Sequence, residues 1–229
     1  MKKIGFTIFT LLAACLALPV HAEEKQELVF TTIEDVPATG VAVRILARAY
    51  GRIGRQFSTL KVPSNRALMM ANSGTVDGDL FRIGDIEDDY PNLIKVPTPL
   101  LLGTLHAVTL NPDLGQWNKE QLGSMRIGVR RGVLVAEMAA EGMNVILVDR
   151  YEQILRLLES GRIEVGLISD IEGSSPIHSQ SWSHVRILEE PVRYFTLHHY
   201  LNHKHSDLVQ PLSRALQQLH NSGETADIN

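Results

Sequence analysis

Residues 72–85, NSGTVDGDLFRIGD, decide the fold that the sequence predicts. An apolar helical run ends at Ser73-Gly74, and a strand with an acidic residue near its start then leads to Arg82 and a glycine-containing turn. The same order recurs 87 residues later, where residues 154–168 (ILRLLESGRIEVGLI) match residues 67–81 (ALMMANSGTVDGDLF). Two copies of helix, Ser-Gly and strand predict two similar α/β lobes.

The two copies differ where their strands end. Asp77 and Glu164 stand at equivalent positions near the starts of the two strands, so their duplication favours a structural role in each lobe over catalysis. After the strands, one copy continues into Arg82 and the other into Ser169 and Asp170. In open α/β sheets, ligands bind beyond the carboxyl ends of the strands, so these exits are the first place to look for a site.

The N-terminus has the pattern of a secretory signal peptide over residues 1–22. Two lysines precede an uncharged apolar run at 4–18, and Val20-His21-Ala22 supplies small residues at the cleavage positions. A membrane anchor is the alternative, but a spanning helix needs roughly 20 apolar residues. We expect export to the periplasm and cleavage after Ala22.

A second interpretation of the leader rests on Cys15. The run Leu12-Ala13-Ala14-Cys15 also fits a bacterial lipobox, which would make Cys15 the lipidated first residue. The residues after Cys15 stay apolar, unlike a polar tether, so soluble release is preferred and the lipoprotein is the minority alternative.

Composition narrows the class of the exported chain. Cleavage after Ala22 leaves 20 basic residues against 26 acidic ones, a net charge of −6, and no cysteine. Disulfides are therefore excluded, and stability must come from packed cores. Lys and Arg form no basic run, which argues against a nucleic-acid partner. We expect a monomer that needs no cofactor or metal and has no catalytic residues.

Strands alternate with helices along the chain, which predicts mostly parallel sheets with a cleft between two lobes. The four exits expected to face that cleft follow Ile33, Phe81, Val129 and Ile168. Predicted strands lie at 28–33, 57–62, 76–81, 94–96, 126–129, 145–148, 163–168, 185–188 and 193–201; predicted helices lie at 39–53, 117–122, 134–141 and 151–160, with further helices capped by Ser64 or Asn65 and by Asp207.

In order and spacing, several motifs resemble the type II periplasmic solute-binding proteins of ABC importers, in particular the polar amino-acid family. The motifs are PSNRAL at 63–68, SGTVDG at 73–78, YPNLIKVP at 90–97, QLGSMRIGVRRG at 121–132, SGRIE at 160–164 and the tail 207–223. The resemblance implies two Rossmann-like lobes, residues 23–107 with 190–229 and residues 108–189, joined by two crossings near 105–110 and 188–194. It also implies capture of a small molecule and a membrane permease or receptor as partner.

The expected ligand groups of that family are missing here. The position of the carboxylate-gripping arginine falls in Glu87-Asp88-Asp89, and the Gly-Ser/Thr of the second lobe has become Gly132-Val133-Leu134. At the position where the family has the acid that binds a ligand ammonium, this sequence has Ser169, and the acid Asp170 follows one residue later. The loop after the first strand, 34–39, is short.

Basic residues take the place of these groups. Arg82 lies directly after the predicted strand of the first copy. Arg130 and Arg131 precede Gly132 at a predicted helix N-terminus, where guanidinium and backbone N–H groups can bind a carboxylate or phosphate. The hypothesis is a small anionic or zwitterionic solute held between Arg82 and Arg130, with Arg131 and Ser169 nearby and Asp170 or Glu34 meeting any ammonium. The alternative is that the arginines pair with Asp79, Asp85 or Glu137.

Other functions remain as rivals. An enzyme on the same fold, such as a small-carboxylate dehydratase, would need a carboxylate or His in the cleft, and Asp170 is the candidate. A ligand-sensing partner of a membrane receptor and a degenerate pocket also stay open. The histidine-rich stretch 198–205 invites a metal site, but it holds no cysteine or carboxylate, so a solvated loop is the preferred interpretation.

Overall fold

The computed structural model describes residues 26–33, 36, 38–84, 86–122, 124–171 and 175–225, without the side chain of Gln121. The leader at 1–22 with Cys15, and the predictions for Glu34 and Asp85, fall outside these residues. Within the described part, no helix is long and apolar enough to cross a membrane.

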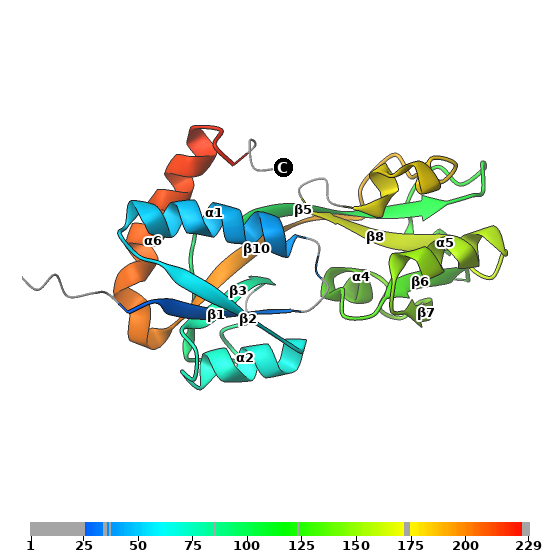
Figure 1. Cartoon of the computed structure of the whole chain (residues 1–229). Helices are drawn as coiled ribbons and strands as arrows, with labels where there is room; N and C mark the ends of the chain where they lie inside the picture. Colours follow the sequence, from blue (N-terminus) through cyan, green and yellow to red (C-terminus); the bar gives the residue numbers. More distant parts are fainter. Residues whose placement is uncertain are drawn as a thin grey trace, which may run out of the picture.

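The predicted strands and helices occur in the predicted order (Figure 1), most of their boundaries agree within two residues, and β5 is a further strand that was not predicted. The last helix begins at Ser206, so Asp207 lies inside it and is not its N-cap, which corrects that prediction. The elements are β1 (Leu28–Ile33), α1 (Thr39–Arg52), β2 (Phe57–Val62), α2 (Ser64–Asn72), β3 (Gly78–Ile83), β4 (Leu93–Lys95), β5 (Leu101–Thr109), α3 (Lys119–Leu122), β6 (Arg126–Arg130), α4 (Leu134–Ala139), β7 (Asn144–Val148), α5 (Tyr151–Glu159), β8 (Val165–Ile171), η1 (Pro176–His178), η2 (Gln180–Trp182), β9 (Arg186–Ile187), β10 (Arg193–Asn202), η3 (His203–His205) and α6 (Ser206–Asn221).

The two halves of the sheet have the same plan. Strand β1 pairs in parallel with β2 and β3, and β6 pairs in parallel with β7 and β8. Each set is completed by one antiparallel strand, β10 beside β3 and β5 beside β8. The sequence repeat is therefore a structural repeat, in which β1-α1-β2-α2-β3 corresponds to β6-α4-β7-α5-β8.

One continuous sheet joins the two lobes, whereas the sequence predicts two separate sheets. The strand order is β2-β1-β3-β10-β5-β8-β6-β7, with β4 and β9 pairing β10 and β5 at the side. The join is the pairing of β5 residues 101–105 with β10 residues 193–197, and β5 continues into the second lobe beside β8. This pairing lies a few residues from the predicted crossings near 105–110 and 188–194, and the sheet does not break between the lobes.

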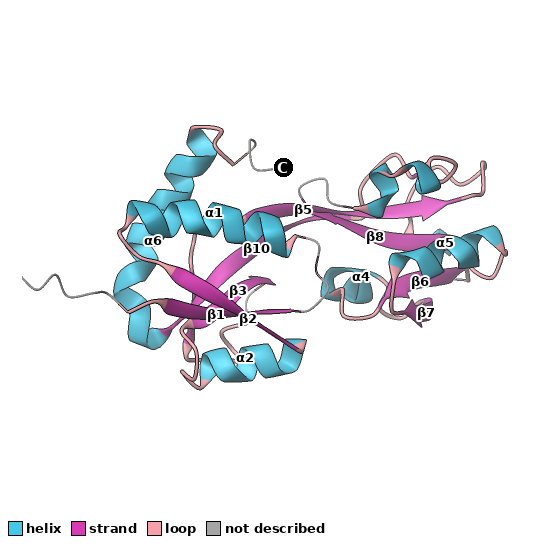
Figure 2. Ribbon diagram, in the orientation of Figure 1, coloured by secondary structure: helices cyan, strands magenta, loops and turns pink. Residues whose placement is uncertain are grey.

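Helices cover both faces of each half of the sheet, which is why its strands are apolar on both sides (Figure 2). In the first lobe, one core packs under α1 and α6 and a second under α2. In the second lobe, one core packs under α4 and the other under α5 and the short η1 and η2 turns. Each lobe therefore has its own buried apolar core.

The repeated Ser-Gly ends the second helix of each lobe in the same way. Ser73 and Ser160 each donate a hydroxyl hydrogen bond to the carbonyl three residues earlier, at 3.0 and 3.2 Å. Gly74 and Gly161 then take positive φ angles of 77° and 65°, the left-handed conformation that commonly ends a helix and that glycine adopts without strain. This turn is why the two copies share their sequence here.

The repeated acids clamp the start of the neighbouring strand. Asp77 accepts a hydrogen bond from the Val29 N–H at 2.7 Å, and the Asp77 N–H donates to the Val29 carbonyl at 2.8 Å. Glu164 forms the same two bonds with Arg126, at 2.7 and 3.0 Å. Partial burial raises the pKa of Asp77, but hydrogen bonds from Lys204, His205 and Val29 outweigh this and lower the pKa below its ordinary value. The geometry agrees with the predicted structural role of both acids.

The histidine-rich stretch covers the end of the predicted last strand, β10, and the short η3 turn that follows it, but its interpretation as a solvated loop is wrong. His199 is fully buried on β10, and its Nδ1 donates to the Leu80 carbonyl at 3.0 Å. Its Nε2 therefore accepts from the Tyr50 hydroxyl at 2.9 Å, which fixes a neutral imidazole inside the core. Burial lowers the pKa of His199 from 6.5 to about 4.

The buried His199 predicts a pH-dependent stability. Its pKa is lower in the folded chain than in the unfolded one, so the unfolded chain binds more protons between pH 6.5 and 4 and stability falls as the pH falls through that window. The loss amounts to about 3 kcal/mol at pH 4. Urea unfolding at several pH values measures it.

The variant His199→Gln keeps an acceptor for Tyr50 but does not titrate. We expect its unfolding free energy to lose less between pH 6.5 and 4 than that of the parent chain, whereas His198→Gln on the same strand keeps the parent's slope. Equal slopes for the parent and His199→Gln would show that His199 is not the source.

Candidate functional site

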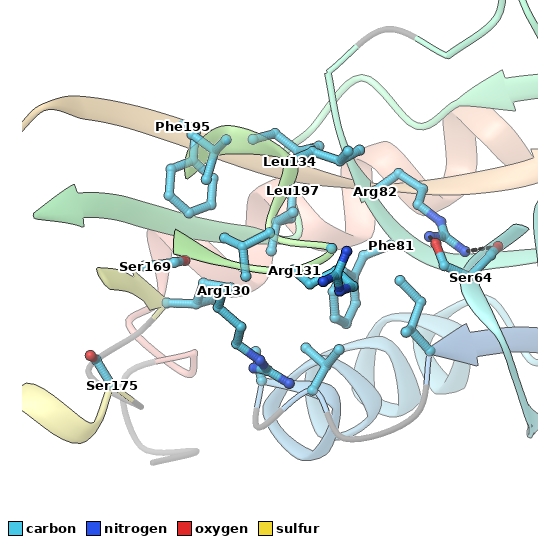
Figure 3. Close-up of a pocket in the computed structure, with 18 of the residues that line it drawn as sticks. Ser64, Phe81, Arg82, Arg130, Arg131, Leu134, Ser169, Ser175, Phe195 and Leu197 are labelled. Atoms are coloured by element: carbon cyan, nitrogen blue, oxygen red, sulfur yellow. Dashed lines mark hydrogen bonds between the residues drawn. The ribbon is translucent and has the colours of Figure 1, made fainter. Parts of the chain in front are cut away.

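A cavity of about 260 Å³ lies between the two lobes. Its walls come from the carboxyl ends of β1, β3, β6 and β8, the four exits predicted from the sequence, and from β10 at the junction of the lobes (Figure 3). Carboxyl ends of parallel strands within a lobe meet at one edge of the sheet, and the two lobes turn these edges toward each other. The two copies of the repeat therefore place the residues in which they differ around one cavity.

Arg82 lines the cavity from the first lobe, but its guanidinium is bound within the protein. Its Nε and Nη2 donate to the two carboxylate oxygens of Asp79 at 3.0 and 2.8 Å. Its Nη1 donates to the Ser64 hydroxyl at 2.9 Å, and Nη2 also reaches the Ser64 carbonyl at 3.3 Å. Arg82 is 7% exposed and Asp79 1%. Of the two predicted roles, the structure shows the internal ion pair, with Asp79 as the partner.

A β-bulge makes this pair possible. Between its pairs with β10, β3 advances three residues, from Asp79 to Arg82, while β10 advances two, from Tyr200 to His198. The extra residue brings side chains three positions apart onto the same side of the strand. Burial raises the pKa of Asp79, and the charge and hydrogen bonds of Arg82 oppose that rise.

Ser64 is the first residue of α2 and does not cap it. The N-cap of α2 is Pro63, and no side chain caps this helix, so the expectation that Ser64 or Asn65 caps it is wrong. The Ser64 hydroxyl accepts from Arg82 instead and lies on the cavity wall. A sequence pattern cannot show whether Ser64 caps α2 or accepts a hydrogen bond from Arg82, because Arg82 is 18 residues away.

Arg130 and Tyr151 form the second lobe's wall. The Arg130 guanidinium carbon lies 5.3 Å from the centroid of the Tyr151 ring, a cation–π arrangement, and its Nε donates to the Asp149 carbonyl at 3.2 Å. The Tyr151 hydroxyl accepts from the Ser169 N–H at 3.2 Å. Burial raises the pKa of Tyr151, so this hydroxyl is neutral near pH 7. Tyr151 thus supports both Arg130 and the end of β8.

Arg131 is the most open of the three arginines. Its side chain is 62% exposed, and its Nε lies 3.4 Å from a carboxylate oxygen of Asp149, itself largely exposed. Ion pairs of this kind contribute little to stability, so a ligand can replace the contact at small cost. Arg131 therefore lines the cavity as an accessible cation.

The helix N-terminus predicted as an anion site is already used by the protein. The Gly132 N–H donates to Glu137 at 2.8 Å, and α4 has only six residues. The expectation of an open N–H at Gly132 is therefore wrong. The Glu137 carboxylate binds the turn that precedes α4. The structure does not show the alternative in which Glu137 pairs with an arginine.

Ser169 lines the cavity, whereas Asp170 does not. Side chains alternate across a strand, so Asp170 lies on the opposite face of β8 from Ser169. There its carboxylate accepts from the Ser175 N–H at 3.0 Å and lies 2.6 Å from His178 Nε2. Because Asp170 comes one residue after the position of the family's acid, its side chain lies on the face of β8 away from the cavity. Glu34 lies outside the described residues.

The rest of the cavity is largely apolar, and this was not predicted. Phe195 and Leu197, two positions apart on β10, share the face that closes it, as the alternation along that strand would have indicated. Among the described residues that line the cavity there is no carboxylate and no histidine. Its apolar lining consists of Ile33, Val36, Ala38, Phe81, Ile83, Val133, Leu134, Val135, Ile171, Pro176, Phe195 and Leu197.

No group of three or more His, Cys, Asp or Glu side chains in the described part of the chain could hold a metal ion. The described residues that line the cavity offer guanidinium, hydroxyl and hydrocarbon groups. Such a set can bind and orient a small molecule.

No known protein-family model matches the chain. An uncharacterised protein of Shewanella oneidensis is 28% identical over 188 residues, which cover 78% of this chain and 70% of that protein.

Comparison with solved structures shows the fold. A histidine kinase sensor domain with similarity to periplasmic binding proteins superposes with a TM-score of 0.69 at 15% identity, over 89% of this chain and 94% of that one. The amino-acid ABC transporter substrate-binding protein AbpA from Streptococcus pneumoniae, bound to L-arginine, gives 0.65 at 13% identity, over 88% and 92%. Tv2483, also bound to L-arginine, gives 0.64 at 17% identity, over 88% of each chain. The chain therefore has the two-lobed fold of periplasmic binding proteins, which these similar structures use in a transport component and in a sensor.

Proposed function

We propose that this chain is an exported solute-binding protein that captures a small anionic or zwitterionic solute between its lobes and presents it to a membrane partner. The observation that carries the proposal is the cavity itself, which is lined by strand ends of both lobes. A ligand that contacts both walls favours the closed arrangement, because it binds that arrangement better than the open one.

The junction of the lobes suits such a movement. The connection is made by β5 and β10, whose mutual pairing covers five residue pairs, and each lobe keeps its own core. Hinge closure needs two rigid bodies and a narrow connection between them. The proposed boundaries remain residues 23–107 with 190–229 for the first lobe and 108–189 for the second.

Transport through an ABC-type permease is the first candidate for the next step, with the leader at 1–22 supplying export to the periplasm. A sensing role is the second, because a histidine kinase sensor domain is among the similar structures. Both roles use the same capture step, so the ligand experiments below apply to either.

An enzyme on this fold receives less support. The proposed dehydratase requires a carboxylate or histidine in the cleft, and its candidate, Asp170, lies on the other face of β8. The described lining residues supply no other group of this kind.

Ligand capture predicts stabilisation by a small organic anion. In a thermal-unfolding screen of amino acids, monocarboxylates, dicarboxylates and phosphates, a true ligand at a hundred times its dissociation constant adds about 2.7 kcal/mol to the unfolding free energy. The same ligand should also reduce the radius of gyration measured by small-angle X-ray scattering, as the lobes close.

Helix α4 offers a matched pair of variants for this screen. Leu134 lines the cavity and Met138 lies one turn further along, and the two are 53% and 59% exposed. Leu134→Trp should narrow the cavity and weaken the ligand's stabilisation, whereas Met138→Trp should leave it unchanged. If no compound in the screen raises the unfolding temperature, solute capture is contradicted.

Arg82 takes a supporting role in this proposal, because Asp79 and Ser64 already occupy its guanidinium. Arg82→Met would leave a buried carboxylate without its partner, which costs about 3 to 5 kcal/mol of unfolding free energy. The double variant Arg82→Met, Asp79→Leu removes both charges and should recover most of that loss. Urea unfolding of the two variants measures the difference.

The same double variant separates support from ligand binding. We expect it to bind the ligand within about threefold of the parent chain, since the pair contributes no net charge to the cavity. A stable double variant with a hundredfold loss of affinity would instead make Arg82 a direct ligand contact.

A further inference from the structure

At the junction of the lobes, three residues on neighbouring strands form one row across the sheet. Phe195 of β10 pairs with Gly103 of β5, and Gly103 pairs on its other side with Ile171 of β8. Paired residues on adjacent strands project from the same face of a sheet. Phe195 and Ile171 both line the cavity (Figure 3 labels Phe195), so this row runs beneath the cavity and forms its floor.

Gly103, in the middle of the row, has no side chain, and the ring of Phe195 takes that space. A Cβ built at Gly103 would lie 2.2, 2.4 and 2.8 Å from the Cζ, Cε2 and Cε1 atoms of the ring. Carbon atoms in contact are about 3.5 to 4.0 Å apart, so a side chain here would displace the ring. Gly103 does not have a positive φ angle, so the need for space explains the glycine and the backbone does not.

The ring of Phe195 lies at the boundary between the lobes. Phe195 packs against the first lobe's core under α1 and α6 and also against the second lobe's core under α4. Ile171, a residue of the second lobe, packs against the first lobe's core. The ring therefore has β5 on one side and the cavity on the other, and a ring displaced from β5 moves toward the cavity.

The opposite face of the same strands supplies a control position. Leu102 and Tyr194 each stand one residue from the row, so their side chains project away from the cavity. They are 58% and 76% exposed. Tyr194 therefore offers an aromatic side chain on the strand of Phe195 that takes no part in the floor.

We infer that Gly103 fixes the depth of the cavity, because it lets the ring of Phe195 lie against β5, and that the ring in turn limits the size of the solute. Gly103 is a positioning residue, since it acts through Phe195 and is not itself a lining residue. This rests on the proposed solute-binding function and adds to it a determinant of solute size.

Crystal structures of the Gly103→Ala and Phe195→Leu chains and of the double variant test the position of the ring. In Gly103→Ala the ring should move roughly 1.3 Å or more toward the cavity, the shift that restores an ordinary carbon contact. Phe195→Leu removes the three ring atoms nearest to the added methyl group, so the double variant should keep β5 in its place. A ring that stays while β5 moves would overturn the inference.

Thermal unfolding gives a second reading of the same contact. The loss of unfolding temperature caused by Gly103→Ala should be smaller in the Phe195→Leu chain than in the parent, and undiminished in the Tyr194→Leu chain. If Gly103→Ala alone does not fold, the double variant with Phe195→Leu should fold and the one with Tyr194→Leu should not. Equal losses in all three chains would show that the methyl group does not act through the ring.

Solute size supplies the functional test. L-Alanine and L-phenylalanine differ by one aromatic ring, and isothermal titration calorimetry compares their affinities in each chain; acetate and phenylacetate give the same comparison for a site that takes no amino acid. Gly103→Ala should lower the affinity for the larger compound relative to the smaller by about tenfold or more, and Phe195→Leu should raise it. Tyr194→Leu should leave the ratio unchanged.

The outcomes separate this inference from the function on which it rests. If the ring moves as expected and the preference for size does not change, the ring does not limit the solute, and solute capture stands. If no compound of the wider screen binds, solute capture itself is overturned, whereas the crystal structures still decide whether Gly103 positions the ring.

Discussion

The ion pair between Arg82 and Asp79 is the interaction on which the binding side of this molecule depends. Both side chains are buried, and the cost of their transfer from water is offset by their mutual pairing and by hydrogen bonds with Thr31, Ser64 and the Phe81 backbone. A bulge in β3 brings them together, and Arg82 in turn joins the end of β3 to the start of α2. One interaction thus fixes the first lobe's wall and removes its charge.

The second lobe uses the same architecture with a different result. Its strand β8 corresponds to β3, and Glu164 clamps β6 as Asp77 clamps β1. Near its carboxyl end β8 carries Ser169 and Asp170, and the Asp170 carboxylate lies on the face away from the cavity, next to His178. The arginines of this lobe come from β6 and stand at the cavity. The two lobes therefore share one frame and differ in the residues that they place at the cavity.

Much of the fold could be predicted, because period and turn chemistry are local. The repeated Ser-Gly, the acids at Asp77 and Glu164 and the four strand exits all follow from short patterns that the structure bears out. Pairing of Arg82 with Asp79 was one of the two predicted roles, but the sequence could not decide between this pair and a ligand contact. The bulge that brings the pair together and the burial of His199 could not be predicted, since both depend on the pairing of β3 with β10, which lie more than 100 residues apart. The apolar wall was missed for the same reason: it becomes one surface only when β10 returns beside β3.

Capture of a solute between the lobes is tested most directly by a crystal structure with a compound that raises the unfolding temperature. The compound should lie in the cavity and contact residues of both lobes. A compound bound outside the cavity, or to one lobe alone, would contradict capture between the lobes.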